Sequence, residues 1–327
     1  MFISRRAPTP YGKILSIPLT SLFGFLALYI PLLHYLGYTY LLFTLSVIAF
    51  SFLGFTISLF PPFREEHPNP HILPYAITSA SITILILTEE LLINSVYVGW
   101  GLTIAIISMV SMPLLGGALW SKDEGARRFL EMCGLVFASR AVLSTFPVNF
   151  LSATTFLPSI YTLIMVAVIL YIHHRKIPPE YTGLARGNSP IHLQILAGIL
   201  AGSALGWIEF CVLKPTPITP SGDILQNILY LIIVMTLFVG LTEEILFRGL
   251  LQRSLTDLLP WWKAIGISSV MFSLMHIGWL NPLEIPFAYS AGVIFGLLFY
   301  RTGSLIAPVT AHALGNIALY GITLLYA

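Results

Sequence analysis

The sequence has little charge. Only 9% of its 327 residues are Asp, Glu, Lys or Arg, whereas 57% are hydrophobic, and the mean hydropathy is +0.87. A soluble domain carries about 25% charged residues, so this composition excludes an ordinary water-soluble globular protein. The formal net charge of +2 provides no strongly basic surface of the kind that binds nucleic acid, and we expect no nucleic-acid partner.

Cysteine is also scarce, and the signatures of several hydrolytic sites are absent. The two cysteines, Cys133 and Cys211, are too few for a disulfide framework and lack metal-ligand spacing. None of the eight histidines is followed by Glu, so the H-E-x-x-H helix of zinc peptidases is missing. The G-x-G-D motif of intramembrane aspartyl proteases does not occur, and the Gly202-Ser203 pair lacks the His partner that the serine type requires.

Long hydrophobic runs make up most of the chain. A membrane-spanning helix needs about 20 mostly apolar residues, and about eleven such runs follow one another with short polar connectors. We therefore predict an all-α, polytopic transmembrane helix bundle, with spans near residues 14–34, 39–60, 74–94, 97–119, 129–146, 156–172, 191–211, 224–250, 263–280, 284–301 and 304–326. Because the first run is long and no small-residue cleavage site precedes Tyr38, we expect it to stay in the mature protein.

The positions of Lys and Arg predict the orientation. Positive charge is concentrated in cytoplasmic loops. With a cytoplasmic N-terminus, thirteen of the 16 Lys and Arg residues fall at inner ends of spans and only Lys214 falls at an outer end, while Arg140 and Arg248 lie within apolar runs. We therefore expect a multi-pass integral membrane protein, in the cell membrane of a prokaryote or the endoplasmic reticulum of a eukaryote.

The longest polar connector, residues 173–190, suggests a boundary. Residues 1–186 are predicted to form an N-terminal transmembrane region of about six spans, to which the sequence assigns no role. Residues 187–327 are predicted to form a core of about five spans. This core opens with Gly198, Gly202 and Gly206, a small-residue stripe that permits close contact between helices in lipid.

Ionisable side chains inside the predicted spans are the first candidates for function, because each costs about 2.5 to 3.5 kcal/mol at the helix centre. Glu243, Glu244 and Arg248 form an E-E-x-x-x-R arrangement on one predicted helix. Glu244 and Arg248 are four residues apart, so they share a face and lie within ion-pairing reach, whereas Glu243 points about 100° away. A carboxylate without a partner in low dielectric suits a general base or acid. For this helix alone, a structural ion pair beside an interfacial glutamate is an equally good interpretation.

Two further predicted helices carry paired side chains. Phe272 and His276 are spaced i, i+4 on one helix, and His312 and Asn316 are spaced i, i+4 on another. A lone His in a membrane helix is usually a satisfied bundle residue, but together with the glutamates these pairs predict one polar pocket. At 1.5 Å per residue, Glu243, His276 and His312 lie about 15, 20 and 12 Å from the inner ends of their helices, so we expect them to meet.

The ordered motifs E-E-x-x-x-R, F-x-x-x-H and H-x-x-x-N resemble those of the CAAX-protease and bacteriocin-processing family. These intramembrane endopeptidases include the type II CAAX prenyl endopeptidases. The resemblance covers about residues 190–327, and every motif position matches: Glu243, Glu244, Arg248, Phe272, His276, His312 and Asn316.

The resemblance implies a peptide hydrolase that acts on prenylated CAAX proteins or on small membrane-associated peptides, in contact with membrane lipid. Glu243 and His276 would activate a water, and His312 and Asn316 would stabilise the oxyanion. The same resemblance implies that Glu244 and Arg248 brace the site and that Phe272 contacts the substrate. The motifs indicate no particular oligomeric state.

The resemblance leaves the question of a metal open. The family is often described as metal-dependent, and a divalent metal such as zinc would then take Glu243, His276 and His312 as ligands. A glutamate acting as general base would in that case also be a ligand. We therefore expect hydrolysis by glutamate without a metal or other cofactor.

Two other groups of acidic residues receive structural interpretations. Thr88-Glu89-Glu90 imitates the start of the E-E-x-x-x-R motif, but Asn94 stands in the place of the arginine. We expect Glu89 and Glu90 to be partners of Arg140, and Glu209 to reach the membrane interface as long side chains do.

Two other functions fit intramembrane carboxylates and histidines. An ion-coupled transporter uses such groups as proton relays, and a non-proteolytic membrane scaffold, for example in bacteriocin immunity, would keep them without catalysis. The intact order of the three motifs favours the protease.

Overall fold

The computed structural model describes residues 72–119, 123–146, 151–215, 218–219 and 223–326. Every regular element within these residues is a helix, as the composition predicted, and no strand occurs among them. The predicted spans at 14–34 and 39–60 lie outside the described residues.

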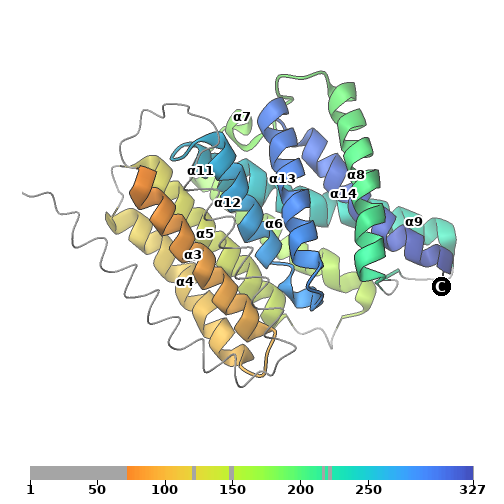
Figure 1. Ribbon diagram of the computed structural model, residues 1–327, viewed down its shortest axis with the longest axis horizontal. Coiled ribbons are helices and arrows are strands. Elements are labelled where there is room, and N and C mark those ends of the chain that lie inside the picture. Colours follow the sequence, from red (N-terminus) through yellow and green to blue (C-terminus); the bar gives the residue numbers. More distant parts are fainter. Residues whose placement is uncertain (1–71, 120–122, 147–150, 216–217, 220–222, 327) are drawn as a thin grey trace, which may run out of the picture.

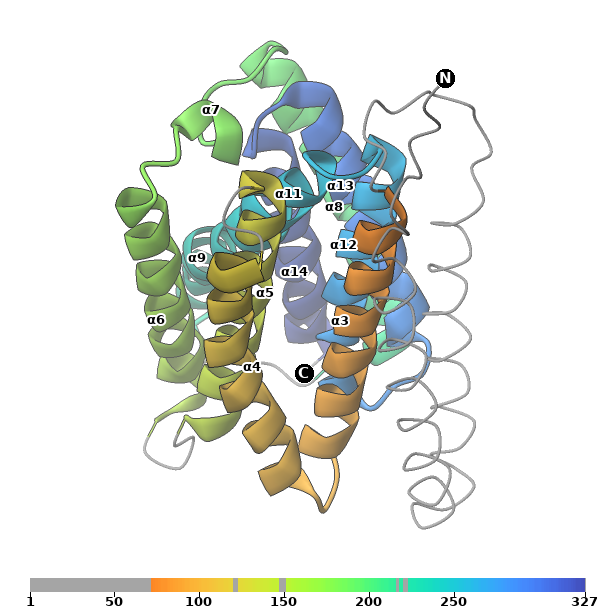
Figure 2. The ribbon, with the colours of Figure 1, turned by 90° about the vertical axis from the view of Figure 1, so that its left-hand side faces the viewer.

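Four long helices precede the predicted boundary. They are α3 (Ile72–Ile93), α4 (Val98–Leu119), α5 (Glu124–Thr145) and α6 (Ala153–His174). The first three pack side by side at one flank of the molecule, and α6 lies next to α5 (Figures 1 and 2). The α5 helix begins where the carboxylate of Asp123 accepts a hydrogen bond of 3.0 Å from the backbone N–H of Ala126, as an N-cap residue does.

The remaining helices surround one long, irregular helix. That helix runs through residues 224–256 as α9 (Ile224–Ile233), the π-helix η2 (Val234–Gly240), α10 (Leu241–Glu244), the π-helix η3 (Ile245–Gln252) and α11 (Arg253–Thr256). Around it lie α7 (Pro179–Thr182), α8 (Ile191–Leu213), α12 (Trp261–Leu274), the 3₁₀ turn η4 (Ile277–Trp279), α13 (Glu284–Thr302) and α14 (Ile306–Tyr326).

Five helices of the described part are long and apolar enough to cross a membrane. They are Val98–Ala118, Thr154–His174, Ile191–Leu213, Ile224–Thr256 and Glu284–Thr302. The other predicted spans within the described residues coincide with the helices α3, α5, α12 and α14, of which α12 ends at Leu274 and not at residue 280. Such a set of long apolar helices is the architecture of an integral membrane protein.

The hydrophobic core crosses the predicted boundary at residues 186 and 187. One cluster of buried side chains includes Ile86 of α3, Phe137 of α5, Ile160 of α6, Leu250 of η3 and Met271 of α12. The four described N-terminal helices therefore pack directly against the helices that carry the motifs. The division into two regions stays a prediction.

The glycine stripe of α8 lies against α14, as expected from its sequence. A Cβ atom at Gly202 would lie 2.4 Å from the carbonyl oxygen of Ala311, and one at Gly206 would lie 2.5 Å from that of Gly315. No side chain fits between backbones this close, so glycine at these positions sets the distance between α8 and α14.

Candidate active site

The acidic pair lies in the middle of the bundle. Glu243 and Glu244 end the four-residue helix α10, which contacts both α6 and α14 and lies between the π-helices η2 and η3. Short π-helical segments inside α-helices occur frequently at functional sites. The side chain of Glu244 is fully buried and that of Glu243 is 20% exposed, so the two neighbouring carboxylates point in different directions, as the 100° step of a helix requires.

Glu244 joins two of the motifs. Arg248 donates a hydrogen bond of 2.9 Å from Nη1 to Oε1 of Glu244, which confirms the predicted i, i+4 ion pair. The same oxygen lies 2.7 Å from Nδ1 of His312 on α14. Arg248 also donates to the backbone oxygen of Gly292 at 3.2 Å. A buried arginine with these partners keeps its charge compensated.

Aromatic rings enclose Arg248 and the two imidazoles. The guanidinium carbon of Arg248 lies 4.4 Å from the ring centre of Phe272 and 5.2 Å from that of Phe295, within the range of cation–π attraction. Phe295 stacks on His312 with the ring centres 5.2 Å apart. The ring of Phe272 lies 4.8 Å from that of His276 and 5.9 Å from that of His312. Phe272 therefore fixes the spacing of the imidazoles.

Each carboxylate oxygen of Glu243 has a different neighbour. Oε2 lies 3.7 Å from Nε2 of His312. Oε1 accepts a hydrogen bond from the hydroxyl of Tyr161, which belongs to α6. These contacts agree with the prediction that Glu243 lacks a partner on its own helix. The sequence did not predict its partner Tyr161, because 82 positions separate the two residues.

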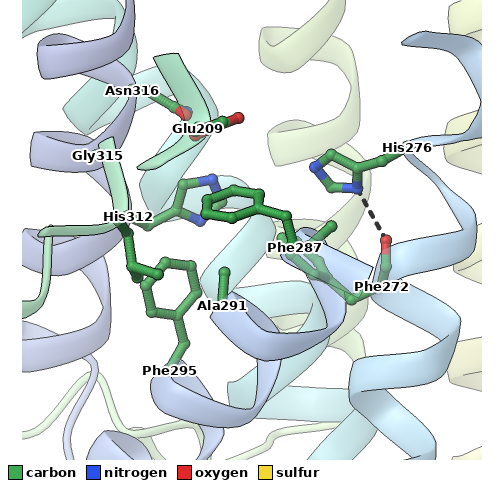
Figure 3. A pocket seen from close by; sticks show the side chains of 11 residues that line it. Glu209, Phe272, His276, Phe287, Ala291, Phe295, His312, Gly315 and Asn316 are labelled. Atoms are coloured by element: carbon green, nitrogen blue, oxygen red, sulfur yellow. Dashed lines mark hydrogen bonds between the residues drawn. The ribbon is translucent and has the colours of Figure 1, made fainter. Parts of the chain in front are cut away.

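His276 lies beyond the helix to which the sequence assigned it. The span was expected to reach residue 280, but α12 ends at Leu274 and His276 precedes the 3₁₀ turn η4. The backbone N–H of His276 bonds to the carbonyl of Ser273, a 3₁₀-type contact that tightens the helix end. Nδ1 of His276 lies 3.0 Å from the backbone oxygen of Phe272 (Figure 3). A carbonyl can only accept, so Nδ1 carries the proton and Nε2 of the neutral ring has a free lone pair.

The second and third motifs line one hollow. His276, His312 and Asn316 contribute polar atoms to its wall, and Phe272, Phe287 and Phe295 contribute aromatic rings (Figure 3). The rest of the wall consists of Leu205, Glu209, Ala288, Ala291 and Gly315. A concave, mostly apolar site with a few convergent polar groups is typical of a binding site for a small ligand or a peptide segment.

Glu209 belongs to this hollow, and its predicted position at the membrane interface is wrong. The residue is buried, with 9% of its surface exposed, and it lines the wall together with Asn316 (Figure 3). The reason is the glycine contact: α8 packs so closely on α14 that the helix face carrying the glycines and Glu209 is turned towards the bundle. The sequence held a usable signal, because Glu209 follows Gly206 by three residues and so shares the face of the glycine stripe.

The second acidic pair has an ion-pair partner outside the three motifs. Arg140 donates a hydrogen bond of 2.6 Å from Nη2 to Oε2 of Glu90, which confirms that predicted partnership. Glu89 is fully buried as well, but neither of its carboxylate oxygens has a hydrogen-bond partner within the described residues. Only Glu90 of the pair therefore forms an ion pair with Arg140.

The residues proposed as metal ligands do not form a metal site in this arrangement. Within the part of the chain that the structure describes, no three side chains of the types His, Cys, Asp and Glu are grouped so that they could hold a metal ion.

Comparison with known proteins agrees with the motifs. Residues 225–318 match the family model described as type II CAAX prenyl endopeptidase Rce1-like. The matched segment contains all seven motif residues, from Glu243 to Asn316. The resemblance to this family of membrane endopeptidases is thereby confirmed for that segment.

Two proteins of Bacillus subtilis (strain 168) are similar over parts of the chain. "Uncharacterized protein YpbD" is 32% identical over 82 residues, which are 25% of this chain and 39% of that protein. "Putative membrane peptidase YdiL" is 32% identical over 95 residues, which are 29% of this chain and 37% of that protein. The chain therefore spans about two fifths of the length of these curated relatives. No solved structure matches it.

Proposed function

We propose that this protein is an intramembrane endopeptidase that hydrolyses a peptide bond with a water activated by Glu243 and His276. One observation carries the proposal: Glu243 lies 3.7 Å from His312, beside the hollow that His276, His312 and Asn316 line. The match of residues 225–318 to the type II CAAX prenyl endopeptidases supports the reaction class.

Glu243 and His276 are suited to activate the water. Nε2 of neutral His276 has a free lone pair, because Nδ1 donates to the backbone of Phe272. The two side chains lie close enough to interact electrostatically. A water held between a carboxylate oxygen and this nitrogen loses a proton to the carboxylate as it attacks the peptide carbonyl, and positioned acid–base groups of this kind contribute about 10² to 10⁴ in rate.

His312 and Asn316 are suited to stabilise the oxyanion. Because Glu244 is paired with Arg248, its carboxylate is ionised and can only accept hydrogen bonds. Nδ1 of His312 therefore donates a hydrogen bond to Glu244. Nε2 of His312 can then donate to an oxyanion only if the ring carries both protons. The carboxylates of Glu243 and Glu244, on opposite sides of the ring, stabilise that cation. The amide of Asn316, one helical turn further on, supplies a second donor.

The wall of the hollow indicates an apolar substrate segment. Phe287, Ala288, Ala291 and Phe295 form an apolar face on α13, and Phe295 stacks on the imidazole of His312. Prenylated CAAX C-termini and small membrane-associated peptides both present aliphatic residues next to the scissile bond, and either class fits the proposal.

We also propose the full membrane topology that the sequence predicts. It consists of about eleven spans with a cytoplasmic N-terminus, in the cell membrane of a prokaryote or the endoplasmic reticulum of a eukaryote. Five long apolar helices among the described residues support a multi-pass arrangement.

The experiment that tests the function is reconstitution of the purified protein with a fluorogenic prenylated peptide and with the same peptide lacking the prenyl group. We expect wild type to cleave at least the prenylated form. The substitutions Glu243→Gln, His276→Ala and His312→Ala are each expected to lower kcat by about 10² to 10⁴, as loss of an acid–base or oxyanion group does.

Two substitutions serve as controls. Glu180→Gln and His192→Ala remove the same functional groups at exposed positions and are expected to leave cleavage unchanged. Thermal unfolding in detergent shows whether each variant is folded. Undiminished cleavage by folded Glu243→Gln would reject the assigned base, and the absence of cleavage by wild type on both peptides would reject the function.

A further inference from the structure

The hydroxyl of Tyr161 forms a contact that the three motifs do not contain. Tyr161 is buried, and its hydroxyl donates a hydrogen bond to Oε1 of Glu243. The other oxygen of that carboxylate, Oε2, is the one that lies 3.7 Å from Nε2 of His312. Tyr161 therefore occupies one oxygen of Glu243 while the second one points towards the residues of the hollow.

The surroundings hold the phenol in this position. Tyr161 packs in a small apolar cluster with Val234, Met235 and Val239 of the long helix and with Leu319 of α14. The helix that carries it, α6, contacts both α10 and η2. A ring packed on several sides has few alternative rotamers, so its hydroxyl stays at the carboxylate.

The position of α6 in the chain gives this contact its significance. The matched family segment begins at residue 225, and Tyr161 precedes it by more than 60 positions. The N-terminal region, to which the sequence assigned no role, thus reaches the carboxylate that acts as base in the proposed function.

We propose that Tyr161 is a positioning residue for Glu243, and that α6 is therefore part of the catalytic unit. The proposal rests on the proposed function. A hydroxyl that donates to one oxygen of a carboxylate fixes the rotation of the group and stabilises its ionised form. The base is then held with Oε2 towards the water.

The test is Tyr161→Phe with Tyr171→Phe as its matched control. Tyr171 lies on the same helix, and its hydroxyl donates to a carboxylate as well, at 2.7 Å to Oε2 of Glu131, away from the hollow. For Tyr161→Phe we expect kcat to fall about tenfold or more with KM nearly unchanged, because hydrogen bonds to charged groups have this magnitude. The acidic limb of the kcat–pH profile is expected to move to higher pH. Tyr171→Phe is expected to keep both properties.

The outcomes separate this proposal from the proposed function. If Tyr161→Phe keeps the kcat and the pH profile of wild type while Glu243→Gln is inactive, the positioning role is wrong and the function stands. If folded Glu243→Gln remains active, the function itself is wrong. The position of the acidic limb does not depend on the amount of folded enzyme, so partial unfolding of Tyr161→Phe would leave the test valid.

A different observation, the carboxylate of Glu209, carries a second proposal. Glu209 is buried, lines the hollow next to Asn316, and lies within electrostatic range of His312 and Glu243. Among the described residues, no side chain forms a hydrogen bond or salt bridge with it. A buried carboxylate that faces a cavity without a partner is ready to pair with a cationic ligand group.

We infer that Glu209 binds the α-ammonium group of a short apolar peptide, which in the proposed reaction is the amine released from the scissile bond. The scissile carbonyl oxygen would face His312 and Asn316, and the nitrogen of the same peptide bond is bonded to that carbonyl carbon. A carboxylate beside Asn316 is therefore within reach of the amine after the bond has broken and the nitrogen has been protonated.

Isothermal titration of the protein with an apolar tripeptide and with its N-acetyl derivative tests this site without any need for cleavage. We expect wild type to bind the free tripeptide about tenfold more tightly than its N-acetyl derivative. Glu209→Gln is expected to bind the two peptides equally. The exposed Glu180→Gln is expected to retain the preference of wild type. Equal binding of both peptides by wild type would overturn the assignment, and so would a preference for the free tripeptide that persists in Glu209→Gln. Whether the proposed function fails is decided separately, by the cleavage assay of Glu243→Gln.

Discussion

Nδ1 of His312 lies 2.7 Å from Oε1 of Glu244, although 68 positions separate the two residues in the chain. The same oxygen binds Arg248. One carboxylate thus connects the first motif to the third, and it determines which nitrogen of His312 faces the hollow and the substrate.

Replacing Glu244 by Gln is expected to lower kcat by about a hundredfold or more. The amide of Gln is uncharged, so it no longer stabilises the imidazolium of His312 that donates from Nε2 to the oxyanion, and the corresponding change in a serine-protease triad has a still larger effect. The measurement is kcat per folded molecule, with the folded fraction taken from thermal unfolding, because Arg248 also loses a partner. A folded Glu244→Gln protein with the kcat of wild type would contradict this role.

Neighbouring substitutions in α3 are expected to differ in stability. Glu90 forms a buried ion pair with Arg140, so Glu90→Gln leaves an uncompensated charge and is expected to lower the free energy of unfolding by about 3 kcal/mol. Both oxygens of Glu89 are buried without hydrogen bonds from described residues, so Glu89→Gln is expected to be neutral or stabilising. Chemical unfolding in detergent measures both. Equal destabilisation by the two substitutions would contradict the difference in pairing.

Close packing of α8 on α14 is expected to make Gly206→Ala destabilising. The added Cβ would lie 2.5 Å from the backbone oxygen of Gly315, so the two helices must separate, at about 1 to 3 kcal/mol. Cleavage is expected to fall as well, because α8 and α14 form adjoining walls of the hollow. The matched control is Gly266→Ala in α12, where a Cβ meets nothing within 4 Å and helix propensity favours Ala by about 1 kcal/mol. Similar unfolding midpoints for both variants would contradict this account.

Removal of divalent metal is expected to leave cleavage unchanged. Three potential ligands do not converge within the described residues, and the proposed chemistry needs only side chains and water. The measurement compares activity before and after dialysis against a chelator, together with the metal content of the active protein. Loss of activity that added zinc restores would contradict the expectation.

The sequence predicted what depends on short-range periodicity. The positions of nine helices in the described residues, the pair Glu244–Arg248 and the glycine contact of α8 all follow from apolar runs and from i, i+4 spacing. These features require no knowledge of how distant helices are arranged.

Features that depend on tertiary contacts were not predictable in the same way. The link between Tyr161 and Glu243 joins helices that no local pattern relates. The end of α12 at Leu274 has no Pro or Gly immediately after it, so an apolar run was extended through His276. Glu209 was assigned to the interface because its distance from the end of its helix predicts its depth in the membrane. That distance does not predict which face of the helix a neighbouring helix covers.

The two π-helical segments on either side of α10 have a consequence for related sequences. Each π turn contains one residue more than an α turn, so η2 and η3 rotate the flanking side chains relative to a regular helix. Deleting a single residue from either segment would restore ordinary α geometry and move the residues of that segment next to the deletion by one position, or about 100° around the helix axis. A deletion in η3 before Arg248 would thus turn Arg248 away from Glu244 and Phe272. We therefore expect insertions and deletions in homologues to be excluded from residues 234–252, even where the surrounding loops vary in length.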